Sequence, residues 1–175
     1  MNFVKYDVSL AVDRNFSIGV DGDLLVYIKD DLKKFKERTV GQIIVMGRKT
    51  LDSLPGGKPL PNRDNIVVSR SMEERPGLHV ASSLEEIPKI VEKIRGESGE
   101  DKKVFLTGGG NLIRQLMDEV DRWYITYVDK AYENFDTQIP NLFEEEDIYL
   151  LEDDEWREEE GIRFKYLVFK NKNFD

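Results

Sequence analysis

The sequence predicts an α/β fold: a mostly parallel twisted sheet with an antiparallel C-terminal hairpin and helices on both faces. Two observations carry this prediction. Short apolar segments alternate with helical patterns in the first two thirds of the chain, as in parallel βα units. The last third holds strand-like segments with no helix long enough to connect them in parallel. Because 175 residues is the length of one domain, we expect residues 1–175 to form a single domain.

The first βα unit lies near the N-terminus. Lys5–Val12 combines β-branched and apolar residues and predicts a strand, and the polar, glycine-bearing segment Asp13–Asp23 predicts a mobile loop. Residues 29–38 are predicted to be helical, because side chains at i, i+4, i+7 and i+11 form one stripe on a helix. The stripe consists of Ile28, Leu32, Phe35 and Thr39.

The second unit follows directly. Gln42–Met46 has the continuous apolar character of a strand buried on both faces, and Gly47 separates it from a short helix that contains residues 48–50. Pro55–Pro61 is rich in turn residues and predicts a loop, after which Asn65–Val68 predicts another buried strand. The pattern of strand, glycine and helix is therefore present once by residue 50.

The same pattern recurs after a longer helix. Ser83–Ile94 predicts a helix with Ser82 or Ser83 at its N-cap and with Pro88 inside it, where a proline can kink the axis. Lys103–Leu106 predicts a third short strand, and Thr107, three glycines and a helix over Asn111–Met117 follow it.

The pattern changes after residue 122. Trp123–Val128, Ile148–Trp156 and Arg163–Phe169 predict strands, and the last two are expected to form a hairpin around Glu158–Gly161. Strands joined by such short connections pair antiparallel. We therefore expect an antiparallel edge on a sheet that is otherwise parallel.

Composition excludes several classes of protein. The absence of cysteine and the single histidine exclude a disulfide framework, and we expect no metal site. No apolar run approaches the roughly 18 residues of a membrane helix, so we expect a cytoplasmic protein without a membrane partner. The segment Glu144–Glu160 holds 11 acids and one arginine, so its net charge of -10 accounts for the whole net charge of -9, and it predicts a solvated face of the late strands. No basic stripe favours nucleic-acid binding.

Two of the predicted strand ends are suited to an anion. Gly108–Gly110 lies between a strand and a helix, where bare backbone N–H groups can face a pyrophosphate, although a tight turn is an alternative. Gly47–Thr50 lies at a second strand end, and Ser69 and Arg70 follow the next strand. Their cations and hydroxyls can hold a phosphate ester, or they can be solvated surface groups. Two such ends in one small domain indicate a dinucleotide with an extra phosphate.

One carboxylate borders the apolar stripe of the first helix. Asp31 lies next to the stripe and one turn from Phe35, whereas Asp30 points away from it. Acids in a first helical turn are favoured by the helix dipole, which accounts for Asp30. Asp31 would also face the cleft, where a carboxylate can recognise a cationic or amidine-like heterocycle. His79 is expected to be a surface or strand histidine without a functional partner.

Taken in order, these segments resemble the dihydrofolate reductase family from about residue 5 to 170. The segments that carry the resemblance are Ala11-Val12-Asp13, Ile18-Gly19, 31–36, 45–50, Leu60-Pro61-Asn62-Arg63, 108–110 and Asp136-Thr137. The resemblance implies the NADPH-dependent reduction of 7,8-dihydrofolate to 5,6,7,8-tetrahydrofolate, with hydride transfer to the pterin ring and protonation at N5, in one-carbon and thymidylate metabolism.

The resemblance also implies the roles of individual residues. Asp31 would bind the 2-amino and N3 side of the pterin and assist protonation at N5, and Thr126 would support it as the second catalytic residue. The implied substrate-binding residues are Phe35, Leu54, Arg63, Leu60, Thr107 and Val26. Arg63 would pair with the α-carboxylate of the glutamate tail.

The implied cofactor is NADPH, and its predicted contacts fall into three groups. The nicotinamide would be contacted by Ala11, Ile18 and Gly19, and the pyrophosphate by Gly109 and Gly110. The adenosine phosphates would be bound by Arg48, Lys49, Thr50, Ser69 and Arg70. The other predicted cofactor-binding residues are Gly47, Asn111 and Leu112. The loop Asn15–Leu24 would close over the site and exclude water. The expected partners are dihydrofolate and antifolate inhibitors, and we expect a monomer.

The chain departs from the family pattern at several positions. Many family members have Pro-Trp where Leu25-Val26 stand, an aromatic or other apolar residue at Thr107, and tyrosine at Ile113. Asn62 stands where glycine is common, and Asn15-Phe16-Ser17 lengthens the first loop. Inhibitor response and substrate affinity are expected to depend on these differences more than the reaction type does.

Two alternatives share part of the pattern. The reductase domain of riboflavin biosynthesis has this fold and uses NADPH, but it would need neither Asp31 beside the pterin nor Arg63 for a glutamate tail. An NADPH-binding protein without turnover is compatible with the missing tryptophan, whereas Asp31 and Thr126 favour an enzyme.

Overall fold

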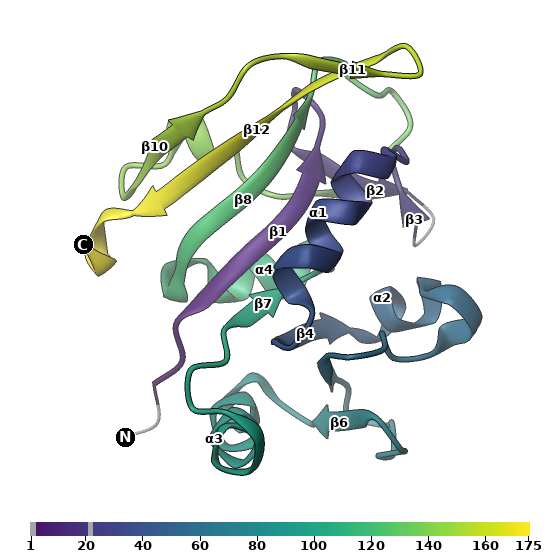
Figure 1. The fold of residues 1–175 in the computed structure, drawn as a ribbon, viewed down its shortest axis with the longest axis vertical. Coiled ribbons are helices and arrows are strands. Elements are labelled where there is room, and N and C mark those ends of the chain that lie inside the picture. Colours follow the sequence, from purple (N-terminus) through teal and green to yellow (C-terminus); the bar gives the residue numbers. More distant parts are fainter. Residues whose placement is uncertain (1–2, 21–22) are drawn as a thin grey trace.

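The computed structural model describes residues 3–20 and 23–175 and is built around one large twisted sheet (Figure 1). Its strands lie in the order β10 (Ile148–Asp153), β12 (Ile162–Asn171), β8 (Val120–Val128), β1 (Tyr6–Val12), β7 (Val104–Leu106), β4 (Ile43–Gly47), β5 (Asp64–Val68) and β6 (Leu78–Ala81). The strands from β8 to β6 are parallel to one another. β12 is antiparallel to β8, β10 and β11 (Arg157–Glu159). The predicted sheet is thereby confirmed, including its antiparallel C-terminal edge.

The helices pack on both faces of this sheet. They are α1 (Lys29–Thr39), α2 (Arg48–Ser53), α3 (Ile87–Ser98) and α4 (Gly110–Leu116). Apolar side chains of α3 and α4, such as Val91 and Leu116, join one core cluster with Ile43 and Val45 of β4. Leu51 of α2 joins a second cluster, which holds Ile44 and Met46 of β4 and lies on the opposite face of the sheet. β4 is therefore buried on both faces, as its apolar run predicts.

Two predicted segments differ in the structure. Ser83–Ile94 is divided into a 3-10 turn, Leu84–Glu86, and the helix α3, which begins at Ile87. Pro88 therefore lies in the first turn of α3, where its missing N–H costs nothing, and it does not kink the helix. Neither serine caps the helix through its side chain; the Ser82 N–H instead donates to the carboxylate of Glu86, 2.8 Å away.

The predicted loop after β1 contains short strands. β2 (Ser17–Val20) pairs with β3 (Asp23–Leu24) and with β9 (Thr137–Gln138) in a small second sheet. Residues 21–22 of that loop lie outside the described residues. Phe16, just before β2, has a φ of 59° and is fully buried. Its ring packs near Tyr127 and Phe143, so the lengthened loop is tied to the core.

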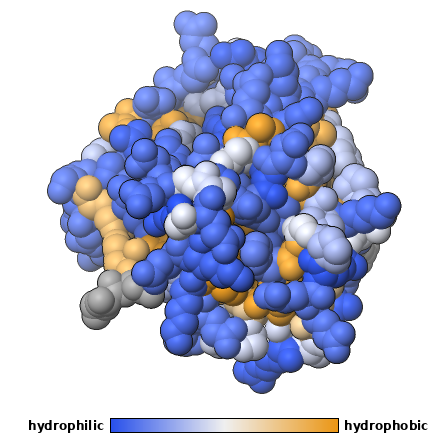
Figure 2. Space-filling model, turned by 60° about the horizontal axis from the view of Figure 1, so that its bottom comes forward, coloured by the Kyte–Doolittle hydropathy of each residue, from blue (hydrophilic) through white to orange (hydrophobic). Residues whose placement is uncertain are grey.

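The surface is mostly polar. Figure 2 shows a largely hydrophilic face with apolar side chains in small separate areas. The acidic segment 144–160 covers β10 and β11, and most of it is exposed, as expected. Its half-buried residues are Glu145, Ile148 and Glu159. In the described part of the chain, no helix is long and apolar enough to cross a membrane.

Candidate active site

The carboxylate of Asp31 is held against the centre of the sheet. Asp31 lies in the first turn of α1, and the buried Thr126 of β8 donates a hydrogen bond from Oγ1 to Asp31 Oδ1 at 2.5 Å. Burial raises the pKa of Asp31, and the hydrogen bond from Thr126 and the charge of Arg38 oppose that shift. The two residues predicted to be catalytic are therefore in direct contact.

The strand register places further predicted residues beside this pair. Thr126 is opposite Ala11 on β1 and opposite Tyr166 on β12. Ala11 is a predicted nicotinamide contact, so it lies one strand away from the threonine that holds Asp31. Tyr166 was not predicted, because a tyrosine in the middle of an apolar strand gives no functional signal by itself.

Asp30 has a specific partner that the helix-dipole argument misses. Tyr166 donates its hydroxyl to the Asp30 carboxylate, and Asp30 is half-buried. Burial and this hydrogen bond both raise the pKa of Tyr166, so the phenol remains the donor. The prediction that Asp30 only points away from the cleft is therefore incomplete.

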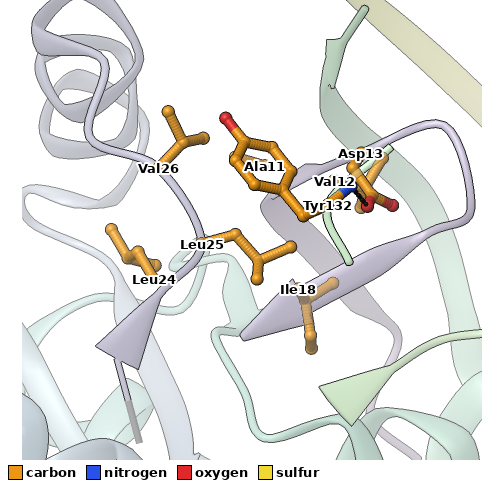
Figure 3. A pocket seen from close by; sticks show the side chains of 8 residues that line it. All are labelled: Ala11, Val12, Asp13, Ile18, Leu24, Leu25, Val26 and Tyr132. Atoms are coloured by element: carbon orange, nitrogen blue, oxygen red, sulfur yellow. Dashed lines mark hydrogen bonds between the residues drawn. The ribbon is translucent and has the colours of Figure 1, made fainter. Parts of the chain in front are cut away.

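A narrow pocket joins the end of β1 to the segment before α1 (Figure 3). It is lined by Ala11, Val12, Asp13, Ile18, Leu24, Leu25, Val26 and Tyr132. The pocket brings together Ala11, Ile18 and Val26, which were predicted on the nicotinamide and substrate sides. Figure 3 shows Leu25 beside the ring of Tyr132. Tyr132 is not among the site residues predicted from the sequence.

Asp13 organises the backbone around this pocket. It is 1% exposed, and its carboxylate accepts hydrogen bonds from the N–H groups of Asn15, Ser17 and Tyr132, each at 2.9 Å. A buried carboxylate is stable only when it is satisfied in this way. Asp13 thus fixes the loop that carries Ile18 relative to the segment that carries Tyr132.

The segment with Arg63 is held by a buried amide. Asn65 is 1% exposed; it accepts from the Leu60 N–H at 2.9 Å and donates to the carbonyls of Leu60 and Arg63 at 2.9 and 3.0 Å. Arg63 donates to Thr39 Oγ1 at 3.2 Å and to the Pro61 carbonyl at 2.9 Å. Since Thr39 in turn donates to the Phe35 carbonyl, the guanidinium is anchored to the end of α1. Leu54 and Leu60 pack beside the second core cluster.

The two predicted anion-binding strand ends adjoin each other. The Gly47 N–H donates to the Gly108 carbonyl at 2.9 Å, and a Cβ at Gly108 would lie 3.2 Å from Thr50 Oγ1. Gly47 also pairs with Val68, which places Ser69 and Arg70 at the same edge. A Cβ built at Gly109 meets nothing within 4 Å, so the bare backbone there is open to a ligand. These residues fit a dinucleotide held by backbone and hydroxyl groups.

The remaining predicted cofactor residues have different surroundings. Arg48 is exposed and forms a 3.5 Å ion pair with Asp52, while Lys49 and Arg70 are exposed. Asn111 is exposed on α4, but Leu112 is 7% exposed and packs in the main core. A cofactor contact for Leu112 stays a prediction, whereas its packing is evident.

Gly110 is required by close packing. A Cβ there would lie 2.8 Å from Thr137 Cγ2 and 2.9 Å from the Gln138 carbonyl oxygen. We expect Gly110→Ala to destabilise the protein by about 1–3 kcal/mol, because overpacking against backbone cannot relax cheaply. Gly96→Ala is the control, since Gly96 lies in helix α3 with nothing within 4 Å of its Cβ. Urea unfolding checks both; a Gly110→Ala protein as stable as the control would contradict the packing argument.

The chain matches known proteins over nearly its whole length. The family model described as dihydrofolate reductase covers residues 7–171. The dihydrofolate reductase of Bacillus subtilis is 36% identical over 166 residues, covering 93% of this chain and 92% of that protein. The dihydrofolate reductase of Haemophilus influenzae is 32% identical and covers 97% of this chain and 100% of that protein. The dihydrofolate reductase of Drosophila melanogaster is also 32% identical and covers 95% of this chain and 98% of that protein. The chain belongs to the dihydrofolate reductase family. The predicted enzyme class and the predicted cofactor, NADPH, are thereby confirmed.

Several departures from the dihydrofolate reductase pattern have a structural explanation. Asn62 has a φ of 61°, in the left-handed region that asparagine tolerates better than most residues, so it can replace glycine. Ile113 is fully buried in the main core and does not line the pocket in Figure 3. Thr107 donates its hydroxyl to the Val45 carbonyl at 3.3 Å. The Gly108–Gly109 peptide bond is cis.

Val26 leaves room beside the pocket where many reductases carry tryptophan. We expect Val26→Trp to change the affinity for antifolate inhibitors more than it changes kcat, because the added ring alters the wall and leaves Asp31 and Thr126 in place. Inhibition constants for several antifolates, measured with kcat for both proteins, check this. Unchanged affinity for all of them would place residue 26 outside the binding pocket.

Proposed function

We propose that this cleft reduces 7,8-dihydrofolate to 5,6,7,8-tetrahydrofolate with Asp31 and Thr126 as the residues that hold the pterin. The observation that carries the proposal is the hydrogen bond between the buried Thr126 and the half-buried Asp31 near the end of β1, beside the pocket of Ala11 and Ile18. A carboxylate in such a place pairs with the amino group and N3 side of the pterin ring.

Asp31 and Thr126 act on the substrate through position and charge. Thr126 donates its only hydroxyl proton to Asp31 Oδ1 and so fixes the orientation of the carboxylate. The negative charge of Asp31 favours a proton on the pterin, and a water held near the carboxylate brings that proton to N5. NADPH supplies the hydride when it is bound.

The rest of the chain holds the two molecules in register. Ala11, Ile18 and Gly19 contact the nicotinamide, Gly109 and Gly110 the pyrophosphate, and residues 48–50, 69 and 70 the adenosine phosphates. Support comes from the Gly47–Gly108 hydrogen bond, which joins both strand ends, and from the open space at Gly109. The loop Asn15–Leu24, whose residues Asn15 and Ser17 donate to Asp13, is expected to exclude water from the reacting atoms.

Arg63 binds the glutamate end of dihydrofolate. Its guanidinium is half-buried and hydrogen-bonded to Thr39, which lowers its freedom to turn away. A guanidinium can take a carboxylate in a bidentate fork. Phe35, Leu54, Leu60, Thr107 and Val26 complete the proposed substrate contacts.

One assay separates this function from its alternatives. The absorbance of the reduced nicotinamide is followed after NADPH and dihydrofolate are mixed with the protein. We expect this absorbance to fall only when the protein and dihydrofolate are both present. Oxidation of NADPH only with a pyrimidine precursor of riboflavin would favour the riboflavin reductase alternative. NADPH binding with no oxidation by either substrate would favour a binding protein.

The proposal includes a single domain acting as a monomer. Size-exclusion chromatography with light scattering checks this, and we expect the mass of one 20.4 kDa chain. A cytoplasmic location stays a prediction from composition.

A further inference from the structure

The helix that carries Asp31 has no cap of its own. The residue at its N-cap position is Ile28, which has extended backbone angles and no side chain able to accept a hydrogen bond. The first backbone N–H groups of a helix have no partner within the helix, so another group must satisfy them. A side-chain oxygen at the N-cap normally does this.

A glutamate from the C-terminal hairpin supplies the missing cap. The Lys29 N–H donates to Glu159 Oε2 at 2.7 Å, and the Asp30 N–H donates to Glu159 Oε1 at 3.2 Å. Both carboxylate oxygens are therefore used, on successive N–H groups of the first turn. Glu159 lies on β11, about 130 residues after α1 in the chain, and this contact fixes the helix start to the hairpin.

The other strand of the hairpin contacts the same turn. Tyr166 of β12 donates to the Asp30 carboxylate, and the Lys34 ammonium lies 4.8 Å from the centre of its ring. Ile28 packs in one apolar cluster with Phe164 and Tyr166. The start of α1 is thus held by three hydrogen bonds and one apolar cluster from a single hairpin.

The same hairpin pairs with β8, the strand whose Thr126 donates a hydrogen bond to Asp31. β12 pairs with β8, and Tyr166 is directly opposite Thr126. Asp31 is consequently placed from two directions: its helix is fixed by β11 and β12, and its carboxylate is fixed by β8.

We propose that Glu159 is a positioning residue for Asp31: by capping α1 from the hairpin, it sets where the carboxylate meets the pterin and how its charge acts there. This inference rests on the role proposed above for Asp31. Glu159 itself touches neither substrate nor cofactor in the proposed arrangement, so it acts through the helix.

The charge of Glu159 gives the role a measurable signature. The charged and titratable groups that face Asp31 are Arg38 and Asp30 on α1, Glu159 on β11 and Tyr166 on β12. Glu159 and Asp30 raise the pKa of Asp31, although burial raises it most. Loss of the Glu159 charge therefore lowers the pKa of Asp31. Loss of this charge also lowers the pKa of N5 on a bound pterin, because a nearby negative charge favours the protonated form of a base.

The test compares two neighbouring glutamates. Glu159→Gln removes the charge and one of the two acceptors; Glu160→Gln removes the same charge from an exposed residue whose carboxylate lies 4.0 Å from Lys29 Nζ. Hydride transfer is measured by stopped flow from pH 5 to 9 at low and high salt. We expect Glu159→Gln to slow transfer about threefold to tenfold at pH 7 through displacement of Asp31. We expect the midpoint of the pH profile of Glu159→Gln to move about 0.3 pH unit or more toward acid, and this shift should be smaller at high salt.

The outcomes decide between a positioning role and plain stabilisation. Glu160→Gln is expected to keep the wild-type rate and midpoint. A Glu159→Gln protein that melts at a lower temperature but keeps the wild-type profile would overturn the inference, and so would equal shifts in both variants. Asp31→Asn, measured in parallel, tests the proposed function separately. If Asp31→Asn is impaired and Glu159→Gln is not, only the inference fails; if Asp31→Asn is unimpaired, both fail.

Discussion

We expect Asp31→Asn to lower kcat/KM for dihydrofolate near pH 7 by about 10²-fold or more, within the range of acid–base groups. The substitution keeps the shape of the side chain and its contact with Thr126 but removes the charge that favours a proton on the pterin. Activity should recover in part at low pH, where dihydrofolate arrives already protonated. For the wild type, the hydride step should slow as pH rises, because the proton needed at N5 becomes scarce.

Single-turnover hydride transfer across pH is the measurement for both proteins. Glu37→Gln is a matched control, because it removes a carboxylate from an exposed position on the same helix. Rates for Asp31→Asn close to wild type at pH 7 would remove Asp31 from the mechanism. Equal losses in Glu37→Gln would show that helix charge alone is responsible.

The pKa of Asp31 also sets the sign of a stability effect. Its pKa is raised on folding, so the folded protein binds that proton more tightly than the unfolded chain does. The stability that this raised pKa contributes is fully present below the unfolded-state pKa and is lost as pH rises through the folded-state pKa. Asp31→Asn should therefore unfold at a higher temperature than wild type near pH 7, and this gain should shrink toward low pH. Such a gain in stability with a loss of rate is typical of catalytic residues.

The second large effect concerns the cofactor. We expect kcat/KM with NADPH to exceed that with NADH at least about tenfold, at 1.4 kcal/mol per decade. The reason is that NADH lacks the 2'-phosphate, and each lost charge-assisted contact costs roughly 1.5–3 kcal/mol. Arg48, Lys49 and Arg70 surround the strand ends at Gly47 and Val68, where that phosphate is expected.

Arg70→Gln tests this preference directly. It should lower kcat/KM with NADPH and leave kcat/KM with NADH unchanged, because only NADPH carries the phosphate. Lys93→Gln on helix α3 removes an exposed positive charge elsewhere and should change neither value. Equal kcat/KM of the wild type for the two cofactors would contradict the assignment of the whole cluster.

The sequence predicted elements whose signal is local. The continuous apolar run before Gly47 identified β4, and the stripe around Phe35 identified α1 to within one residue of its observed end. β6 was missed, because its four residues include His79 and show neither alternation nor a long apolar run. β2, β3 and β9 were missed for a related reason: each is two to four residues long and is stabilised by partners distant in sequence.

The residues of the candidate site could likewise be predicted only where their signal is local. Asp31 could be found because its place on a helix face follows from spacing alone. Glu159, Tyr166 and Tyr132 could not, because their contacts with Asp30, Lys29 and Asp13 link segments more than 100 residues apart. In the sequence, Glu159 is one of many acids in a charged segment. Only the fold distinguishes it from its neighbour Glu160.

On the ribosome, β1 is made well before both of its neighbours: Tyr6 pairs with Val104 and Val12 pairs with Tyr127. Until then both edges of an apolar strand lack partners, and such long-range pairing is slow to form. At about 5–20 residues per second, the wait from Val12 to Tyr127 lasts roughly 6 to 23 seconds in each round of translation. During that time the nascent chain carries an unpaired apolar strand, and exposed strands of this kind make folding intermediates prone to aggregation.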